Sequence, residues 1–143
     1  MSFQVRLSVR FYELDRYGRL SNSCFMQYAD HVRWQCCRAA GITEEAFKKS
    51  GAGPVNLETT IRYHRELFLD DEIDISCTFT YGEGKTYRDN YQFRRADGTL
   101  AAEVNNVCGL LDFKARKLLP DPVAYWRALA KVPVLLGLDE NPD

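Results

Sequence analysis

One long helical pattern, followed by an unbroken series of strand patterns, restricts the folds open to this chain more than any other feature. Apolar residues recur at helical spacing between residues 25 and 40, and Gly41 supplies a C-terminal stop. From residue 55 to residue 113 the pattern changes to the period of two that is typical of strands with one buried face. We therefore expect the α+β class, with one sheet wrapped around one central helix.

The remaining elements are expected on both sides of this central pattern. Residues 3–11 alternate with period two and predict a first strand whose odd positions, Phe3 to Phe11, are buried. A short helix is expected at residues 43–49, capped by Thr43, and a terminal helix at residues 123–130, capped by Asp121. The later strands are expected at residues 55–63, 73–81, 86–95 and 100–113, with turn signals at 82–85 and 96–99 that predict antiparallel hairpins.

Chain length and composition favour one globular domain. The 143 residues fit a single domain, and no Pro/Gly/Ser-rich stretch divides them. We expect this domain to span residues 1–143, with a core at about 3–113 and a C-terminal helix and tail at 121–143. A sheet of this kind has a free outer face and free edges, which predicts a homodimer or a homotetramer.

Charge and cysteine content count against several classes of protein. Lys plus Arg (19) nearly balance Asp plus Glu (20), so the chain has no field that would steer it to nucleic acid or to an anionic membrane. The first residues lack the apolar stretch of a signal peptide, no run approaches the ~20 apolar residues of a membrane span, and we expect a cytoplasmic protein. Neither a metal nor another cofactor is expected, because the cysteines lack CxxC spacing and nearby histidines and are predicted to be packed thiols: Cys24, Cys36, Cys37, Cys77 and Cys108.

The segment from residue 9 to residue 28 resembles the signature of hotdog thioesterases of the 4-hydroxybenzoyl-CoA thioesterase type. In this segment a strand leads to Asp15, Gly18 follows three residues later, and a short loop enters the long helix. The similarity continues along that helix through Asp30, Arg33, Arg38, Gly41 and Ile42. Residues 63–73 look like the family's strand, bend and Asp-containing turn. The resemblance covers the chain through about Phe113 and implies a hotdog fold, an antiparallel sheet of about five strands wrapped around the helix.

The same resemblance implies a thioesterase that hydrolyses an acyl-CoA or an acyl-carrier-protein thioester. Asp15 would be the nucleophile or the general base, and both roles stay open. The first turn of a helix leaves its N–H groups unpaired, so Asn22 is the first choice for the oxyanion-hole amide, with Ser23 beside it. The expected substrate-binding residues, of which the last two would hold coenzyme A phosphates, are Tyr17, Gly18, Phe25, Tyr28, Lys85 and Arg88.

Departures from the family pattern leave other functions open. Many relatives carry histidine, asparagine and tyrosine where this chain has Asn22, Cys24 and Phe25. A non-catalytic acyl-binding or scaffolding hotdog protein is therefore an alternative. A hotdog dehydratase is a third option, but such enzymes work with a His and acid pair near the helix, and His31 is the first histidine of this chain.

Two further carboxylates compete with Asp15. Glu13 is expected at a polar or edge position of the first strand, and Glu58 on the strand face opposite Leu57. His64, at a strand end, is expected to be a structural donor, as lone histidines more often are. The acyl group and the choice between coenzyme A and a carrier protein stay open.

Overall fold

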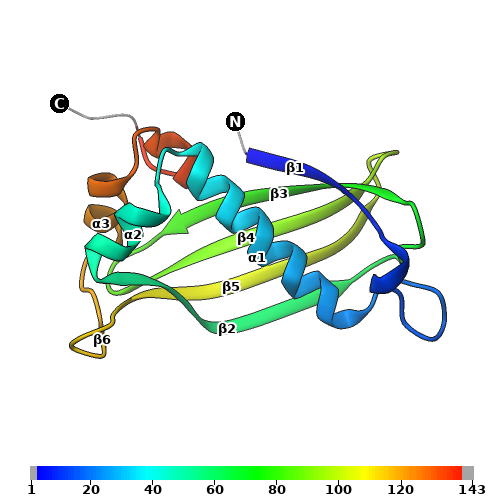
Figure 1. Cartoon of the computed structure of the whole chain (residues 1–143), viewed down its shortest axis with the longest axis horizontal. Helices are drawn as coiled ribbons and strands as arrows, with labels where there is room; N and C mark the ends of the chain where they lie inside the picture. Colours follow the sequence, from blue (N-terminus) through cyan, green and yellow to red (C-terminus); the bar gives the residue numbers. More distant parts are fainter. Residues whose placement is uncertain (1–2, 140–143) are drawn as a thin grey trace.

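A computed structural model describes residues 3–139; residues 1, 2 and 140–143, at the two ends of the predicted domain, lie outside the described residues. Figure 1 shows a long helix, α1 (Asn22–Ala39), lying across a curled sheet. The strands are β1 (Phe3–Ser8), β2 (Ala52–Tyr63), β3 (Glu72–Tyr81), β4 (Thr86–Arg95), β5 (Leu100–Asp112) and β6 (Lys117–Leu118). The other helices are α2 (Glu44–Ser50) and α3 (Pro122–Leu129), and the 3-10 helices are η1 (Phe11–Glu13) and η2 (Pro133–Leu136).

The sheet confirms the predicted hotdog fold. Its strand order is β1-β3-β4-β5-β2, neighbouring strands are antiparallel, and the short β6 pairs with β5. Strand β2 therefore lies at one end of the described sheet, where it pairs with β5. Its register against β5 shifts between Asn56 and Glu58, which marks a bulge near the middle of the strand.

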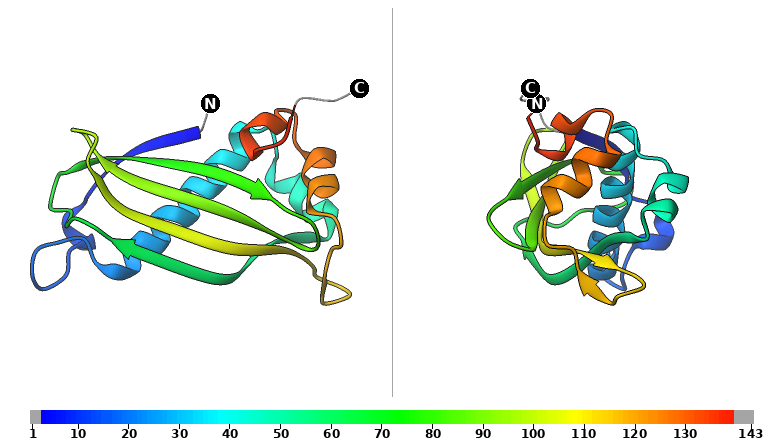
Figure 2. Two further views of the ribbon diagram at one scale, coloured as in Figure 1. Left: turned by 180° about the vertical axis from the view of Figure 1, so that it is seen from behind. Right: turned by 90° about the vertical axis from the view of Figure 1, so that its left-hand side faces the viewer.

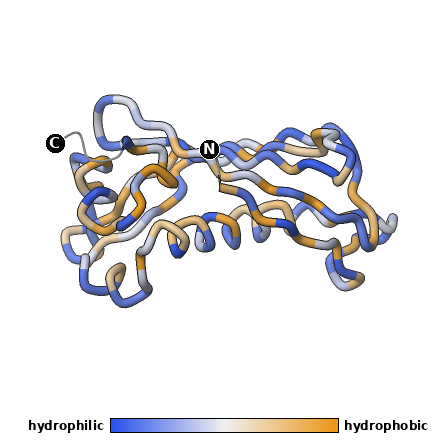
Figure 3. The backbone as a smooth tube through the Cα atoms, turned by 90° about the horizontal axis from the view of Figure 1, so that it is seen from above, coloured by the Kyte–Doolittle hydropathy of each residue, from blue (hydrophilic) through white to orange (hydrophobic). Residues whose placement is uncertain are grey.

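The core lies between α1 and the concave face of the sheet. Helix α1 buries Phe25, Val32 and Cys36, while Tyr91 and Phe93 of β4 are buried opposite them. In Figure 3 apolar and polar residues alternate in short stretches along α1, as expected for a helix that buries one face. All five cysteines are free and buried, which confirms the predicted packed thiols. None of the helices within residues 3–139 is long and apolar enough to cross a membrane.

The C-terminal segment closes one end of this core. Figure 2 shows α3 and η2 at the same end of the sheet as α2. Trp126 of α3 and Leu136 of η2 are fully buried in the same cluster as the α1 side chains. The cap prediction for α3 is confirmed, because the Asp121 carboxylate accepts a hydrogen bond from the backbone N–H of Ala124 at 3.1 Å.

The prediction for the first strand is wrong beyond Ser8. The chain leaves the sheet at Val9, whose N–H donates to the carbonyl of Asp71, and then forms η1. Phe11, predicted on the buried face, is 78% exposed. Strand β3 begins at Glu72, opposite Ser8, so the alternating pattern continues where no partner strand is left to pair with it.

Candidate active site

Asp15 lies in a closed loop between η1 and α1. Its backbone N–H donates to the carbonyl of Arg19 at 2.8 Å, and the N–H of Gly18 donates to the carbonyl of Asp15 at 3.0 Å. Gly18 has a φ of +81°, a left-handed conformation that glycine adopts without steric cost. A bridge between Leu14 and Leu20 closes the base of the loop, so the carboxylate of Asp15 is held in a tight turn.

Hydrogen bonds within this loop keep the carboxylate of Asp15 ionised. Oδ1 accepts from the backbone N–H groups of Tyr17 at 2.8 Å and Arg19 at 3.3 Å, and Oδ2 accepts from Nε of Arg19 at 3.2 Å. Partial burial opposes ionisation, but these donors and the positive charge of Arg19 outweigh it, so the pKa of Asp15 lies below its usual value. The side chain remains 29% exposed.

The first turn of α1 presents free backbone donors. Ser21 is the N-cap, and its side chain makes no capping hydrogen bond. The N–H of Ser21 is already bonded to the carbonyl of Glu13 at 2.9 Å, and that of Cys24 to Ser21 at 3.0 Å. Within residues 3–139, the N–H groups of Asn22 and Ser23 donate to no protein atom. Both are therefore available to an acceptor from outside the chain.

A cleft of about 500 Å³ opens beside this helix start. It runs from α1 to the end of β2 and is lined by Arg19, Leu20, Asn22, Phe25, Tyr63, His64, Arg65, Glu66 and Leu67. The ring of Phe25 packs edge-on against Tyr63, with centroids 5.2 Å apart. Asp15 does not line the cleft itself, because Arg19 stands between them and also pairs with Glu66 on the rim.

The predicted substrate residues near the loop have different environments. Phe25 lines the cleft, whereas Tyr28 is buried and donates its hydroxyl hydrogen to the carboxylate of Glu13. Tyr17 is 72% exposed, and the guanidinium carbon of Arg19 lies 5.3 Å from the centre of its ring, a cation–π contact.

Lys85 and Arg88 lie toward the end of the sheet that is opposite to the Asp15 loop. Lys85 is in the turn between β3 and β4, which Figure 1 shows far from the loop that precedes α1. Arg88 is exposed between the buried residues Tyr87 and Asp89, so it points to the outer face of the sheet. Within one chain these two cations are not brought together with Asp15 or Asn22.

Glu13 is placed differently from its expected polar or edge position. It belongs to η1 and is buried, and its Oε1 accepts from the backbone N–H of Arg10 at 2.9 Å as well as from Tyr28. Its backbone carbonyl accepts the hydrogen bond from the N–H of Ser21. Glu13 thus fixes the start of α1 from the inside of the molecule.

Sequence reasoning did not assign the cleft wall formed by residues 64–67. His64 is the most notable of them, since its Nε2 lies 3.1 Å from Oε2 of Glu103. The one signal for this wall was the family resemblance of residues 63–73, which did not indicate that the segment lies against the start of α1. The N–H of Leu20 donates to the carbonyl of Leu67 at 2.7 Å and fixes that contact.

The antiparallel sheet curled around α1 defines a hotdog fold. The family model described as "Thioesterase-like superfamily" matches residues 9–130, and the chain belongs to this superfamily. The match extends past Phe113, where the resemblance in the sequence was expected to end, and includes α3.

Individual relatives agree with this assignment. The chain is 25% identical over 114 residues, 79% of its length, to the chloroplastic acyl-acyl carrier protein thioesterase ATL3 of Arabidopsis thaliana, of which the match covers 60%. The chain spans about 60% of the length of the curated relatives it matches.

Solved structures share the fold. The probable thioesterase YbaW of Escherichia coli gives a TM-score of 0.74 at 21% identity, covering 82% of this chain and 88% of that one. The hypothetical protein SAV2348 of Staphylococcus aureus, solved in complex with CoA, gives 0.82 at 15% identity, covering 100% and 90%. At these identities the likeness shows the fold alone.

Proposed function

We propose that this protein hydrolyses an acyl thioester of coenzyme A or of a carrier protein, with Asp15 as its carboxylate and α1 as its oxyanion site. The observation that carries the proposal is the pair of free N–H groups on Asn22 and Ser23 in the first turn of α1, where Asn22 lines the cleft. Thioester hydrolysis develops negative charge on the carbonyl oxygen, and preorganised donors lower its barrier, by about 3 kcal/mol for one such donor.

Asp15 has two possible roles in this reaction. As a general base it takes a proton from water while the water oxygen attacks the carbonyl carbon; the C–S bond then breaks and the thiolate leaves. As a nucleophile its oxygen attacks the carbonyl carbon, the C–S bond breaks and the thiolate leaves, and water then hydrolyses the resulting anhydride and frees the carboxylate of Asp15. Both roles need an ionised carboxylate, and the lowered pKa of Asp15 supplies one. Arg19 must move from Oδ2 in either case, and Glu66 offers it a second partner.

We further propose that the working unit contains at least two copies of the chain, joined along β2. Residues 56–60 of this end strand are exposed, including Leu57 at 49%. Two copies of β2 that pair antiparallel run in opposite directions, so the Tyr63 end of one lies beside the Ala52 end of the other. The turn between β3 and β4 of one copy, which contains Lys85, would then adjoin the Asp15 loop of the other copy. Sedimentation analysis tests this, and a monomer at micromolar concentration would contradict it.

A panel of acyl-CoA and acyl-carrier-protein substrates tests the activity directly. The expected result is release of free thiol from at least one of them, at a rate that depends on enzyme concentration. The comparison of the two carriers also decides between them: ATL3 is named for carrier-protein substrates, whereas the SAV2348 structure holds CoA.

One observation favours a second candidate function. Both carboxylate oxygens of Asp15 already accept hydrogen bonds within their own loop. Catalysis by Asp15 would require Arg19 to leave Oδ2, whereas a protein that only binds the acyl group would keep all of these hydrogen bonds. Tight binding of acyl-CoA with no release of thiol from any substrate would support that function.

A further inference from the structure

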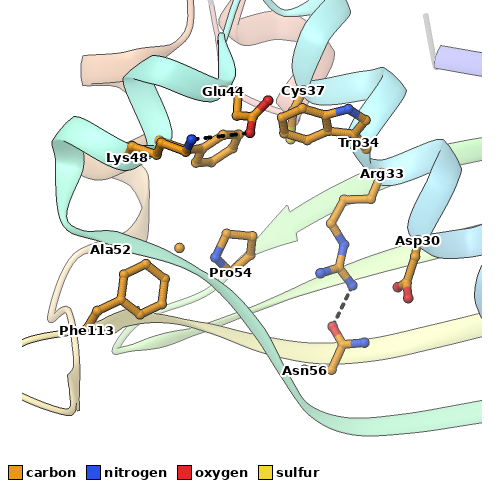
Figure 4. Close-up of a pocket in the computed structure, with 12 residues that line it drawn as sticks. Asp30, Arg33, Trp34, Cys37, Glu44, Lys48, Ala52, Pro54, Asn56 and Phe113 are labelled. Carbon is orange, nitrogen blue, oxygen red and sulfur yellow. Dashed lines mark hydrogen bonds and ion pairs between the residues drawn. The ribbon is translucent and has the colours of Figure 1, made fainter.

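A second cavity of about 550 Å³ lies between α1, α2 and the first half of β2. Figure 4 shows its walls, which are largely apolar: Trp34, Phe47, Pro54 and Phe113 line them. The polar head groups of Arg33, Asn56 and Asp30 lie together at one side, and Glu44 pairs with Lys48 at the other. Arg33 follows Asn22 by three turns of α1, or roughly 16 Å at 1.5 Å per residue, so the cavity is separate from the cleft.

The positive charge of Arg33 is already balanced inside the protein. Its Nε lies 3.3 Å from Oδ2 of Asp89, a fully buried carboxylate on β4. Asp89 also accepts hydrogen bonds from Nδ2 of Asn106 at 2.8 Å and from the thiol of Cys108 at 3.5 Å. A ligand therefore needs no negative charge beside Arg33. An uncharged oxygen that accepts a hydrogen bond suffices.

Two donors beside this pair have no partner in the described part of the chain. Oδ1 of Asn56 accepts from Nη2 of Arg33, which fixes the orientation of the amide and leaves Nδ2 free. Within residues 3–139, neither Nδ2 of Asn56 nor Nη1 of Arg33 donates a hydrogen bond. A purely apolar ligand would leave both donors unsatisfied in the filled cavity, at a cost in binding.

Stability alone does not explain the pair of Arg33 and Asp89. The side chain of Arg33 is 12% exposed and that of Asp89 is 0% exposed, so both charges are almost fully desolvated. Replacing such a pair by packed apolar residues is often neutral or stabilising. Its presence at a cavity wall instead fits a role in binding.

We infer that this cavity holds the acyl group of the thioester and that Arg33 and Asn56 donate hydrogen bonds to an uncharged oxygen on the acyl chain. The substrate class is then a keto- or hydroxyacyl thioester rather than a saturated one. This inference rests on the proposed function. In the β2-paired dimer the cavity of one copy lies beside the cleft of its partner, because the cavity is lined by Ala52 and Pro54 at the start of β2 and the cleft by Tyr63 at its end.

The test compares acyl-CoA substrates of equal chain length, one saturated and the others with a single keto group at successive carbons. For at least one keto position we expect kcat/KM to exceed that of the saturated substrate by roughly tenfold, the value of a hydrogen bond of about 1.4 kcal/mol. Asn56→Leu should remove this preference, so that kcat/KM for the preferred keto substrate falls to that for the saturated substrate in the same variant. Thr60→Leu, on the opposite face of β2, is the matched control and should keep the preference.

Asn56 is preferred over Arg33 for this test because removing Arg33 would leave Asp89 buried without a partner. Equal kcat/KM for all keto positions and the saturated substrate would overturn the inference and leave the thioesterase proposal standing. A preference that survives in Asn56→Leu would also overturn it, since the preference would then come from the intrinsic reactivity of the substrate. No hydrolysis of any substrate would remove the proposed function, and this inference with it.

Discussion

Nε of Arg19 lies 3.2 Å from Oδ2 of Asp15, and the same guanidinium pairs with Glu66 on the rim of the cleft. Arg19 thus connects the carboxylate to the cleft while covering one of its oxygens. This contact stabilises the charge of Asp15 and at the same time restrains its use in a reaction.

Replacing Arg19 should raise the pKa of Asp15. In Arg19→Ala the side-chain hydrogen bond and the positive charge are lost, so the pKa should move toward the ordinary value of about 3.9. An NMR titration that follows the carboxyl carbon of Asp15 measures this. Arg16→Ala is the control, because exposed Arg16 makes no hydrogen bond or ion pair among the described residues. The same titration midpoint in both variants and the wild type would contradict the prediction.

The pH dependence of activity should lack an acid limb from Asp15 in the neutral range. Its lowered pKa keeps the carboxylate ionised down to about pH 4. Protonation of Asp15 should therefore not lower kcat/KM between pH 8 and pH 5. The same lowered pKa contributes stability above the unfolded-state pKa, and this contribution is lost as the pH falls through the folded-state value. An acid limb near pH 6 would instead implicate a group other than Asp15.

The backbone N–H of Asn22 can be removed without removing the helix. Asn22 is the first residue of α1, a position that accepts proline, and Ser21 before it has a ψ of 145°, which a residue before proline adopts readily. Asn22→Pro should lower kcat by about 10²–10³. Asn22→Ala keeps the N–H and should lose little. Circular dichroism checks that both variants fold, and equal kcat in the two would exclude this N–H from the oxyanion site.

Gly137→Ala should destabilise the fold without touching the cleft. Gly137 has a φ of +75°, and a Cβ there would overlap the backbone carbonyl oxygen of Phe79. The conformation and the overlap together should lower the free energy of unfolding by at least about 2 kcal/mol. Urea denaturation measures this loss. Gly82→Ala, where a Cβ meets nothing within 4 Å, should stay within about 0.5 kcal/mol of the wild type.

The elements of the fold were largely predictable because their patterns are local. Strand β4 has the predicted bounds of residues 86–95, and α1 covers nearly all of the predicted helical pattern at residues 25–40. Periodicity reports which face of a segment is apolar, but it does not report where a partner strand ends. For that reason the first strand was predicted too long, and Phe11 was assigned to the wrong environment.

The candidate site was predictable only in part. The loop of Asp15 and the start of α1 are adjacent in the sequence, so their proximity follows from chain connectivity. The cleft wall at residues 64–67 depends on a contact across more than 40 residues, that of Leu20 with Leu67. The pair of Arg33 and Asp89 depends likewise on the register between α1 and β4, which no local pattern contains.

Asp15→Asn is the most direct test of the central claim, because the substitution keeps the size of the side chain and removes its charge. On the best substrate of the panel, kcat should fall by about 10²–10⁴, the usual contribution of a general base, while KM changes little. Glu58→Gln, which removes an exposed carboxylate from β2, should retain the wild-type kcat. A kcat for Asp15→Asn within about twofold of the wild type, in a folded protein, would show that Asp15 does not act in the reaction.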